Sequence, residues 1–309
     1  MSDRFLFWAP TLIWATTWHV ILYQLGEVAV LQSVAMRFGL ASLLLFAFAH
    51  WRGESMVFSR RQHGWLLLTG AVQYGFNYMG TYEAEKHLAS GLLAVLFSLM
   101  IFSNAIGGAL LFGQTITRRF LLSALVGVVG IVLIFWPDIA ATRAGPGVWG
   151  AVGLGLMAVA FASTGNMLTL RLTRGGAALI PLLAWSMAYG AAVLLLIAAA
   201  TGVEFRLDPR PSYWLSLLYL TVFGSVVAFL LYFKLAQRQG PGRAALTGMV
   251  IPPLALLMSM LLEGWHPTLV SGAGMLLCLT GLWGATRPVL PALDSEASPH
   301  HNDQYDHID

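Results

Sequence analysis

The chain alternates between long apolar runs and short polar segments, and this pattern predicts membrane-spanning helices. Each run holds about 20 residues, which as a helix crosses a hydrocarbon core roughly 30 Å thick. Backbone groups in lipid have no water to bond, so the runs are expected to be helices. The ten predicted spans cover residues 5–25, 29–50, 64–84, 88–113, 119–137, 147–171, 177–201, 211–236, 243–263 and 268–287.

The composition supports a polytopic, all-α membrane protein. Of the 309 residues, 58% are hydrophobic and only 10% are charged, whereas a soluble domain carries about 25% charged residues. The formal charge of +3 does not point to nucleic acid, because the basic residues sit at the ends of the runs. The single cysteine, Cys278, excludes a disulfide framework. We expect no cofactor and no metal, and we expect a disordered tail over residues 289–309.

Lysine and arginine are distributed unevenly between the loops, which indicates an orientation. If both termini are cytoplasmic, twelve of the 17 basic residues lie in inner segments and four in outer ones, and Arg37 lies within a span. This excess follows the positive-inside rule. The sequence therefore predicts cytoplasmic termini, and a monomer is expected.

The chain also repeats itself at an offset of 149 residues, with smaller shifts near the start. The matched pairs are Trp65 and Trp214, Gly75 and Gly224, Gly91 and Gly240, Met100 and Met249, and Gln114 and Glu263. Several pairs on one offset indicate an internal repeat, here residues 1–142 and 143–288. Because each half holds five spans, the second half must cross the membrane in the opposite sense. Inverted repeats place a substrate site near the midplane and allow alternating access.

One pattern resembles a known family. The ninth predicted span has small residues early, Ala244 and Ala245, then Pro252 and Glu263. This pattern resembles the EamA repeat of the drug/metabolite transporter superfamily. The fourth span departs from it, with Ser103 in place of the proline and Gln114 in place of the acid.

Within that superfamily the chain is similar to the YddG-type aromatic amino-acid exporters. The segment Trp14–Trp18, the tyrosine-rich third span and Trp185 carry this likeness. The resemblance implies a ten-helix carrier in the bacterial inner membrane that moves amino acids out of the cytoplasm.

Several spans offer polar and aromatic side chains on shared helix faces. In the third span, Tyr74, Tyr78 and Tyr82 follow a spacing of four residues, which places them on one face. Aromatic rings and methionine suit an apolar or aromatic substrate, and amides and hydroxyls suit its head group. The candidate substrate-binding residues are Trp18, Tyr74, Asn77, Tyr78, Tyr82, Met100, Asn104, Thr164, Asn166 and Trp185.

Each candidate has a structural alternative. Tyr82 lies near the outer end of its span, where it is either an interface anchor or a substrate gate. Asn104 and Asn166 can equally bond across helices to pack them. Arg37 is the one charge well inside a span, and either serves function or pairs with helix carbonyls.

Two spans carry residues that bend helices. Pro252 and Pro253 lie in the ninth span, and proline removes a backbone hydrogen bond. Gly107 and Gly108 lie at a similar place in the fourth span and also allow a helix to bend, less strongly than proline does. We expect these four residues to act as hinges.

We expect no predicted span to contain a deeply buried Asp or Glu, because Glu27, Glu83, Glu85 and Glu263 lie at or near the outer ends of their spans. The sequence therefore predicts transport without an embedded acidic proton site. An exporter of another small metabolite or drug fits the same pattern. A membrane enzyme is a weaker alternative, because the histidines are dispersed and lack acid partners at catalytic spacing. A receptor is also weaker, because it does not explain an inverted repeat.

Overall fold

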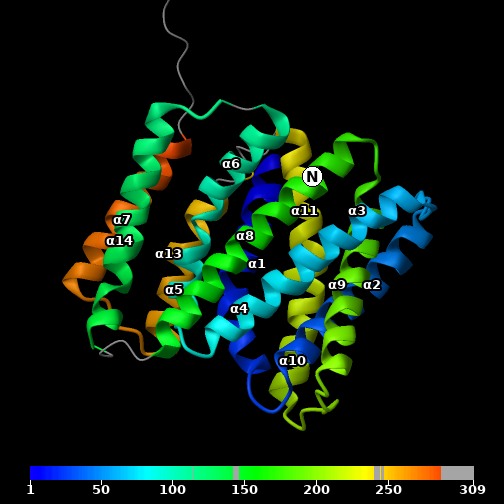
Figure 1. Cartoon of the computed structure of the whole chain (residues 1–309), viewed down its shortest axis with the longest axis horizontal. Helices are drawn as coiled ribbons and strands as arrows, with labels where there is room; N and C mark the ends of the chain where they lie inside the picture. Colours follow the sequence, from blue (N-terminus) through cyan, green and yellow to red (C-terminus); the bar gives the residue numbers. More distant parts are fainter. Residues whose placement is uncertain (114, 142–145, 240–243, 245–246, 287–309) are drawn as a thin grey trace, which may run out of the picture.

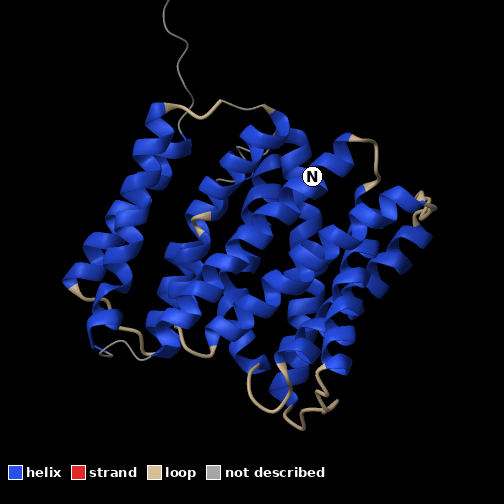
Figure 2. Ribbon diagram, viewed as in Figure 1, coloured by secondary structure: helices blue, strands red, loops and turns tan. Residues whose placement is uncertain are grey.

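A computed structural model describes residues 1–113, 115–141, 146–239, 244 and 247–286 of the chain. Over these residues the chain forms helices joined by loops, without a strand (Figure 2). The predicted tail at 289–309 lies outside the described residues. The elements are α1 (Asp3–Ile21), η1 (Leu22–Gln24), α2 (Val30–Trp51), α3 (Arg60–Gly70), η2 (Ala71–Phe76), α4 (Asn77–Glu85), α5 (Ser90–Phe97), α6 (Met100–Phe112), α7 (Arg118–Ala141), α8 (Pro146–Arg174), α9 (Leu179–Ala200), α10 (Pro211–Tyr219), η3 (Leu220–Val227), α11 (Ala228–Gln239), α13 (Thr247–Leu262) and α14 (Leu269–Thr286).

The predicted apolar runs coincide with helical segments. Consecutive elements such as α3, η2 and α4 follow one another without a loop, so they form one segment over residues 60–85. Within the described part of the chain, each predicted span matches such a segment to within four residues at either end. Among the described residues, six segments are long and apolar enough to cross a membrane: Asp3–Gln24, Val30–Trp51, Ser90–Leu110, Gly147–Arg174, Leu179–Ala200 and Pro211–Gln239. Val250–Leu262 and Leu269–Gly284 are shorter apolar helices.

Two pairs of helices pack in antiparallel fashion at opposite sides of the bundle (Figure 1). In the α7–α14 pair, Gly127 faces Gly281 and Gly130 faces Gly274. In the α2–α9 pair, Gly39 faces Ala191, and the rings of Phe46 and Trp185 lie 5.0 Å apart. Glycine brings the α7 and α14 backbones close together, as small residues do in membrane helices.

Two helical segments contain π-helical turns at corresponding places. η2 begins at Ala71 and η3 begins at Leu220, 149 residues later. A π-turn leaves backbone carbonyls without their usual partner, and side chains take up some of them here. Asn77 Nδ2 donates to the Gln73 carbonyl at 3.1 Å, and Ser225 Oγ donates to the Leu220 carbonyl at 2.9 Å.

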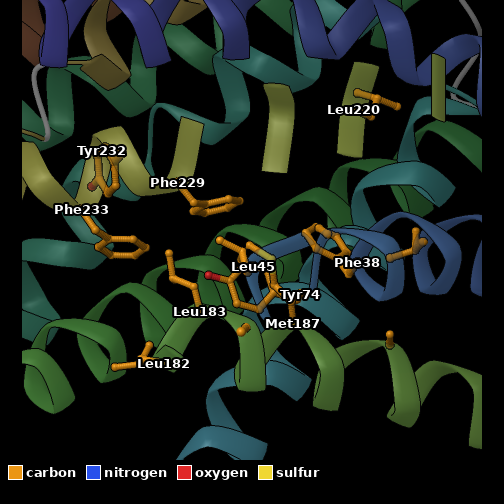
Figure 3. Close-up of a cluster of buried hydrophobic side chains, with 14 of the residues drawn as sticks. Phe38, Leu45, Tyr74, Leu182, Leu183, Met187, Leu220, Phe229, Tyr232 and Phe233 are labelled. Atoms are coloured by element: carbon orange, nitrogen blue, oxygen red, sulfur yellow. The ribbon is translucent and has the colours of Figure 1, made fainter. Parts of the chain in front are cut away.

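The buried apolar residues form two large clusters, one on each side of the molecule. The first joins α2, η2, α9 and α11, and Figure 3 shows Phe38, Tyr74, Met187 and Phe229 packed within it. The second joins α5, α7, α8, α13 and α14 around residues such as Leu93 and Ile134. The space between the two clusters holds the site described next.

Candidate functional site

A cavity of about 110 Å³ lies between the two apolar clusters. Trp14 and Tyr78 reach it from the first cluster, and Trp18 and Phe97 reach it from the second. Its walls come from α1, η2, α4, α5, α8, α11 and α13, with Met100 at the start of α6. The full lining is Trp14, Thr17, Trp18, Ile21, Gln73, Asn77, Tyr78, Thr81, Ala94, Phe97, Ser98, Met100, Ala162, Asn166, Phe229, Tyr232, Thr247, Gly248, Ile251 and Pro252.

Aromatic rings form much of one wall. The Trp14 ring lies 5.2 Å from the ring of Phe229 and 5.2 Å from that of Tyr232. Its indole N–H donates to the Gly224 carbonyl in η3 at 3.1 Å, so the π-turn supplies the acceptor that fixes the ring. Trp18 makes an edge contact with Phe97 at 4.9 Å. Such faces suit a flat apolar group.

The polar groups of the lining are amides and hydroxyls. Gln73 Nε2 donates to Asn166 Oδ1 at 3.3 Å, and Asn166 Nδ2 lies 3.4 Å from the Met100 sulfur. The Gln73 carbonyl oxygen Oε1 is buried and has no hydrogen-bond partner among the described residues. Ser98, directly after α5, and Thr247, at the start of α13, add hydroxyls. None of the lining residues that the structure describes is charged, so a net-neutral ligand matches this surface best.

The helical segment over 90–112 is broken beside the cavity. α5 ends at Phe97 and α6 begins at Met100. Across the break the bonds span three residues, from Ser98 N to Val95 O and from Leu99 N to Leu96 O. The predicted hinge residues Gly107 and Gly108 lie later in the chain, inside continuous α6. Helix α13 runs through Pro252 and Pro253, and their role as hinges stays a prediction.

Five of the ten predicted substrate residues line the cavity, and five do not. Trp18, Asn77, Tyr78, Met100 and Asn166 are brought together there. Tyr74 and Tyr82 are fully buried in the first apolar cluster instead. The three tyrosines share a face that packs on α2, where Tyr74 and Tyr78 contact the Phe38 ring and Tyr82 accepts a hydrogen bond from Arg37. The face that meets the cavity carries Gln73, Asn77 and Thr81, with Tyr78 at its edge. Asn104, Thr164 and Trp185 are the other three that lie outside the lining.

These three residues have other surroundings. Trp185 donates its indole N–H to the Met56 carbonyl at 3.0 Å and stacks on Tyr189 at 5.7 Å, which holds the 52–59 loop against α9. Thr164 is exposed and donates to the Ala160 carbonyl. Asn104 Oδ1 is buried without a hydrogen-bond partner among the described residues.

Several lining residues were not predicted from the sequence. Phe229 and Tyr232 are three apart in α11, a helical spacing that is also typical of ordinary packing. Gln73 lies four residues before Asn77, and this spacing indicates that the two side chains share a helix face.

Arg37 is buried, with 1% of its surface exposed, and lies behind the cavity wall. Its Nε donates to Ser225 Oγ at 2.9 Å, and its Nη1 donates to Tyr82 OH at 3.2 Å. Its guanidinium carbon sits 4.6 Å from the centre of the Tyr78 ring. Arg37 therefore ties α2 to η3 and α4, and it contacts the Tyr78 ring of the cavity wall.

One end of the bundle is closed by polar contacts around Glu263. The Glu263 carboxylate accepts hydrogen bonds from Ser90 N and Ser259 Oγ, both at 3.0 Å, and lies 3.0 Å from His19 Nδ1. Ser90 Oγ also donates to it. These contacts join α1, the start of α5 and the end of α13. We call this region the Glu263 end.

Glu85 corrects a further expectation. It closes α4, and only 4% of its surface is exposed. The expectation that no acid is buried in the helical bundle is therefore wrong. The sequence placed Glu85 near a helix end but could not show that neighbouring helices cover it.

The EamA-like transporter family model matches residues 4–136 and again residues 149–287. The chain belongs to the EamA-like transporter family. It is 26% identical to protein PecM of Dickeya dadantii over 266 residues, which covers 83% of this chain and 82% of PecM. It is also 26% identical to the inner membrane transporter YedA of Escherichia coli K12 over 257 residues, 82% of this chain and 80% of YedA.

A shorter match is 34% identity over 116 residues to the inner membrane transporter YicL of Salmonella typhimurium, covering 38% of this chain and 36% of YicL. A crystal structure at 18% identity superimposes with a TM-score of 0.68 and covers 92% of this chain and 96% of that one, which supports the fold alone. The family assignment makes the chain a membrane transporter rather than an enzyme.

Proposed function

We propose that this EamA-family transporter exports apolar and aromatic amino acids by alternating access, as YddG-type exporters do. The observation that carries the proposal is the central cavity, which combines indole and phenol rings with uncharged amides and hydroxyls. Rings stack on an apolar side chain. A zwitterionic head group has no net charge and is matched by dipoles such as Gln73, Asn77 and Asn166.

The proposed machinery is two inverted five-helix halves, residues 1–142 and 143–288. Four observations support it: two separate family matches, π-turns 149 residues apart, and antiparallel packing of α2 on α9 and of α7 on α14. The members of each helix pair occupy corresponding places in the two halves. Halves related in this way present the cavity to either side when one rocks against the other.

The proposed orientation puts both termini in the cytoplasm and the Glu263 end outside, in accord with the distribution of basic residues. At the Glu263 end, α5 packs on α13 so closely that a methyl group on Gly91 would lie 2.8 Å from Leu256 Cα. This conformation is thus closed to the outside, and substrate enters from the cytoplasm.

A flux assay in proteoliposomes tests the proposal. The purified chain is reconstituted, and uptake of labelled phenylalanine, tryptophan and threonine is compared with that of a cationic dye. We expect flux of phenylalanine and tryptophan above that of protein-free vesicles, and none of the dye. Dye flux without amino-acid flux would assign the cavity to another substrate class.

A further inference from the structure

We propose that Glu85 is a proton-binding site that couples amino-acid export to inward movement of a proton. The coupling part rests on the proposed function, whereas the proton site stands on the geometry of Glu85 alone. Both carboxylate oxygens of Glu85 are buried, and neither has a hydrogen-bond partner among the described residues.

The other acidic side chains near Glu85 have ion-pair or hydrogen-bond partners. Glu83, two residues earlier, pairs with Lys86 at 2.7 Å, and its side chain is 38% exposed. Glu263 accepts hydrogen bonds from two serines and meets His19. An ionised carboxylate that is buried without such bonds costs several kcal/mol, so the neutral acid is the favoured form of Glu85 in this conformation.

The charged and titratable groups around Glu85 do not replace those bonds. The positive charge of Arg37 on α2 attracts an ionised Glu85 carboxylate, whereas the negative charge of Glu263, just after α13, repels it. Tyr82 lies about one turn earlier on α4. The Arg37 donors Nε and Nη1 already serve Ser225 and Tyr82.

The remaining elements packed against α4 contribute little charge. They are α5, η2 and α8. Helix α5 carries no titratable side chain, and η2 carries only Tyr74. Helix α8 carries only Arg171 and Arg174, both in its last turn. Lys86 and His87 follow Glu85 in the next loop, and Lys86 is paired with Glu83.

The position of Glu85 connects the cavity with the closed end. Thr81, one helical turn before Glu85, lines the cavity. Helix α5 packs against both α4 and α13, and its start is held by Glu263. When α5 and α13 separate, water reaches Glu85 and stabilises its ionised form. Closing the Glu263 end then requires a proton, taken from the outer side and later released through the cavity.

Infrared difference spectroscopy tests the proton site without any substrate. The full chain in lipid nanodiscs is compared with Glu85→Gln and, as a matched control, Glu83→Gln. We expect a carboxylic-acid C=O band at neutral pH that Glu85→Gln removes, Glu83→Gln retains and rising pH abolishes. Glu85→Asp should keep an acid band, shifted in frequency.

Two infrared results would overturn the proposal. The absence of a Glu85-dependent acid band at every pH at which the protein stays folded would mean that the carboxylate is ionised. Loss of the band when sodium replaces choline at constant pH would make the site a metal-cation site instead.

Transport tests the coupling. With one proton exchanged per net-neutral amino acid and the membrane potential held at zero, a gradient of one pH unit drives about tenfold accumulation of labelled phenylalanine on the acidic side. We expect this accumulation for the wild type and Glu83→Gln, and its loss in Glu85→Gln. Gradient-driven accumulation by Glu85→Gln at the wild-type level would overturn the coupling. If the wild type carries no amino acid, the proposed substrate class fails, and the infrared result still decides the proton site.

Discussion

The guanidinium of Arg37 lies 4.6 Å from the centre of the Tyr78 ring, and the same ring forms part of the cavity wall. A buried cation thus stands one side chain away from the proposed substrate. Because Arg37 also bonds Ser225 in η3 and Tyr82 in α4, it joins segments from both halves of the sequence. Its role in the fold is to fix the wall on which the substrate would stack.

Arg37→Lys is therefore expected to destabilise the protein. Lysine cannot reach Ser225 and Tyr82 together, and a buried donor or acceptor left unpaired costs about 1–3 kcal/mol. Unfolding by denaturant in detergent micelles measures the change. Arg52→Lys is the control, because Arg52 is half exposed and pairs with Glu54 at the surface, where such pairs contribute about 0–1 kcal/mol. Equal stability of both variants and the wild type would refute the role of Arg37.

The close contact of α7 with α14 gives a second prediction. A methyl group on Gly130 would lie 2.6 Å from the Gly274 carbonyl oxygen, so Gly130→Ala must push the helices apart at a cost of about 1–3 kcal/mol. Gly153→Ala on α8 is the control, because nothing lies within 4 Å of the added methyl. Gly130→Ala should lower the thermal unfolding temperature, and Gly153→Ala should leave it unchanged or raise it. The opposite order would contradict the packing described.

Asn166 and Thr164 lie on two different faces of α8, and only the Asn166 face meets the cavity. Asn166 lines the cavity, whereas Thr164 is exposed and bonds only the Ala160 carbonyl. We expect Asn166→Ala to weaken phenylalanine binding about tenfold, as loss of a hydrogen bond of about 1.4 kcal/mol would. Thr164→Val should leave binding unchanged. Scintillation proximity binding measures both, and a reversed pattern would place the substrate on the Thr164 face.

The 201–210 loop supplies a prediction about pH. Asp208 is buried, and its carboxylate accepts hydrogen bonds from Arg210 at 2.6 Å and 2.9 Å. These bonds lower the pKa of Asp208. A lowered pKa means that the stabilisation is present above the ordinary aspartate pKa and is lost as pH falls through the folded-state value.

Asp208→Asn should therefore lower the unfolding temperature at neutral pH, and its difference from wild type should shrink in acid. Glu204→Gln is the matched control, since Glu204 is exposed and pairs with Arg206. If the Asp208→Asn difference stays constant across the acidic range, the carboxylate does not stabilise the loop in its ionised form.

The helices followed from the sequence, because lipid leaves the backbone no alternative to internal hydrogen bonds. The sequence predicted less well which side chains point into the cavity. Tyr74, Tyr78 and Tyr82 share a face, but that face packs against Phe38 and Arg37 of α2. The neighbouring face, with Gln73, Asn77 and Thr81, lines the cavity instead.

The burial of Glu85 and the break at Ser98 could not be predicted from the sequence either. Each depends on how helices distant in the chain pack together: α5 and α8 against α4 in one case, and the cavity beside α5 in the other. By contrast, Trp18, Asn77 and Asn166 were found, because large rings and amides within apolar runs are conspicuous.

The most direct test of the central claim is whether the cavity binds the amino acid and opens to each side in turn. In a Cys278→Ala background, Thr81→Cys places a thiol in the cavity, and Thr69→Cys on α3 places one in the buried interior outside it. A membrane-impermeant thiol reagent is applied from either side of oriented vesicles. We predict that Thr81→Cys reacts from both sides, that phenylalanine protects it, and that Thr69→Cys stays unreactive. Labelling of Thr81→Cys from one side only, or without protection by any amino acid, would contradict the account.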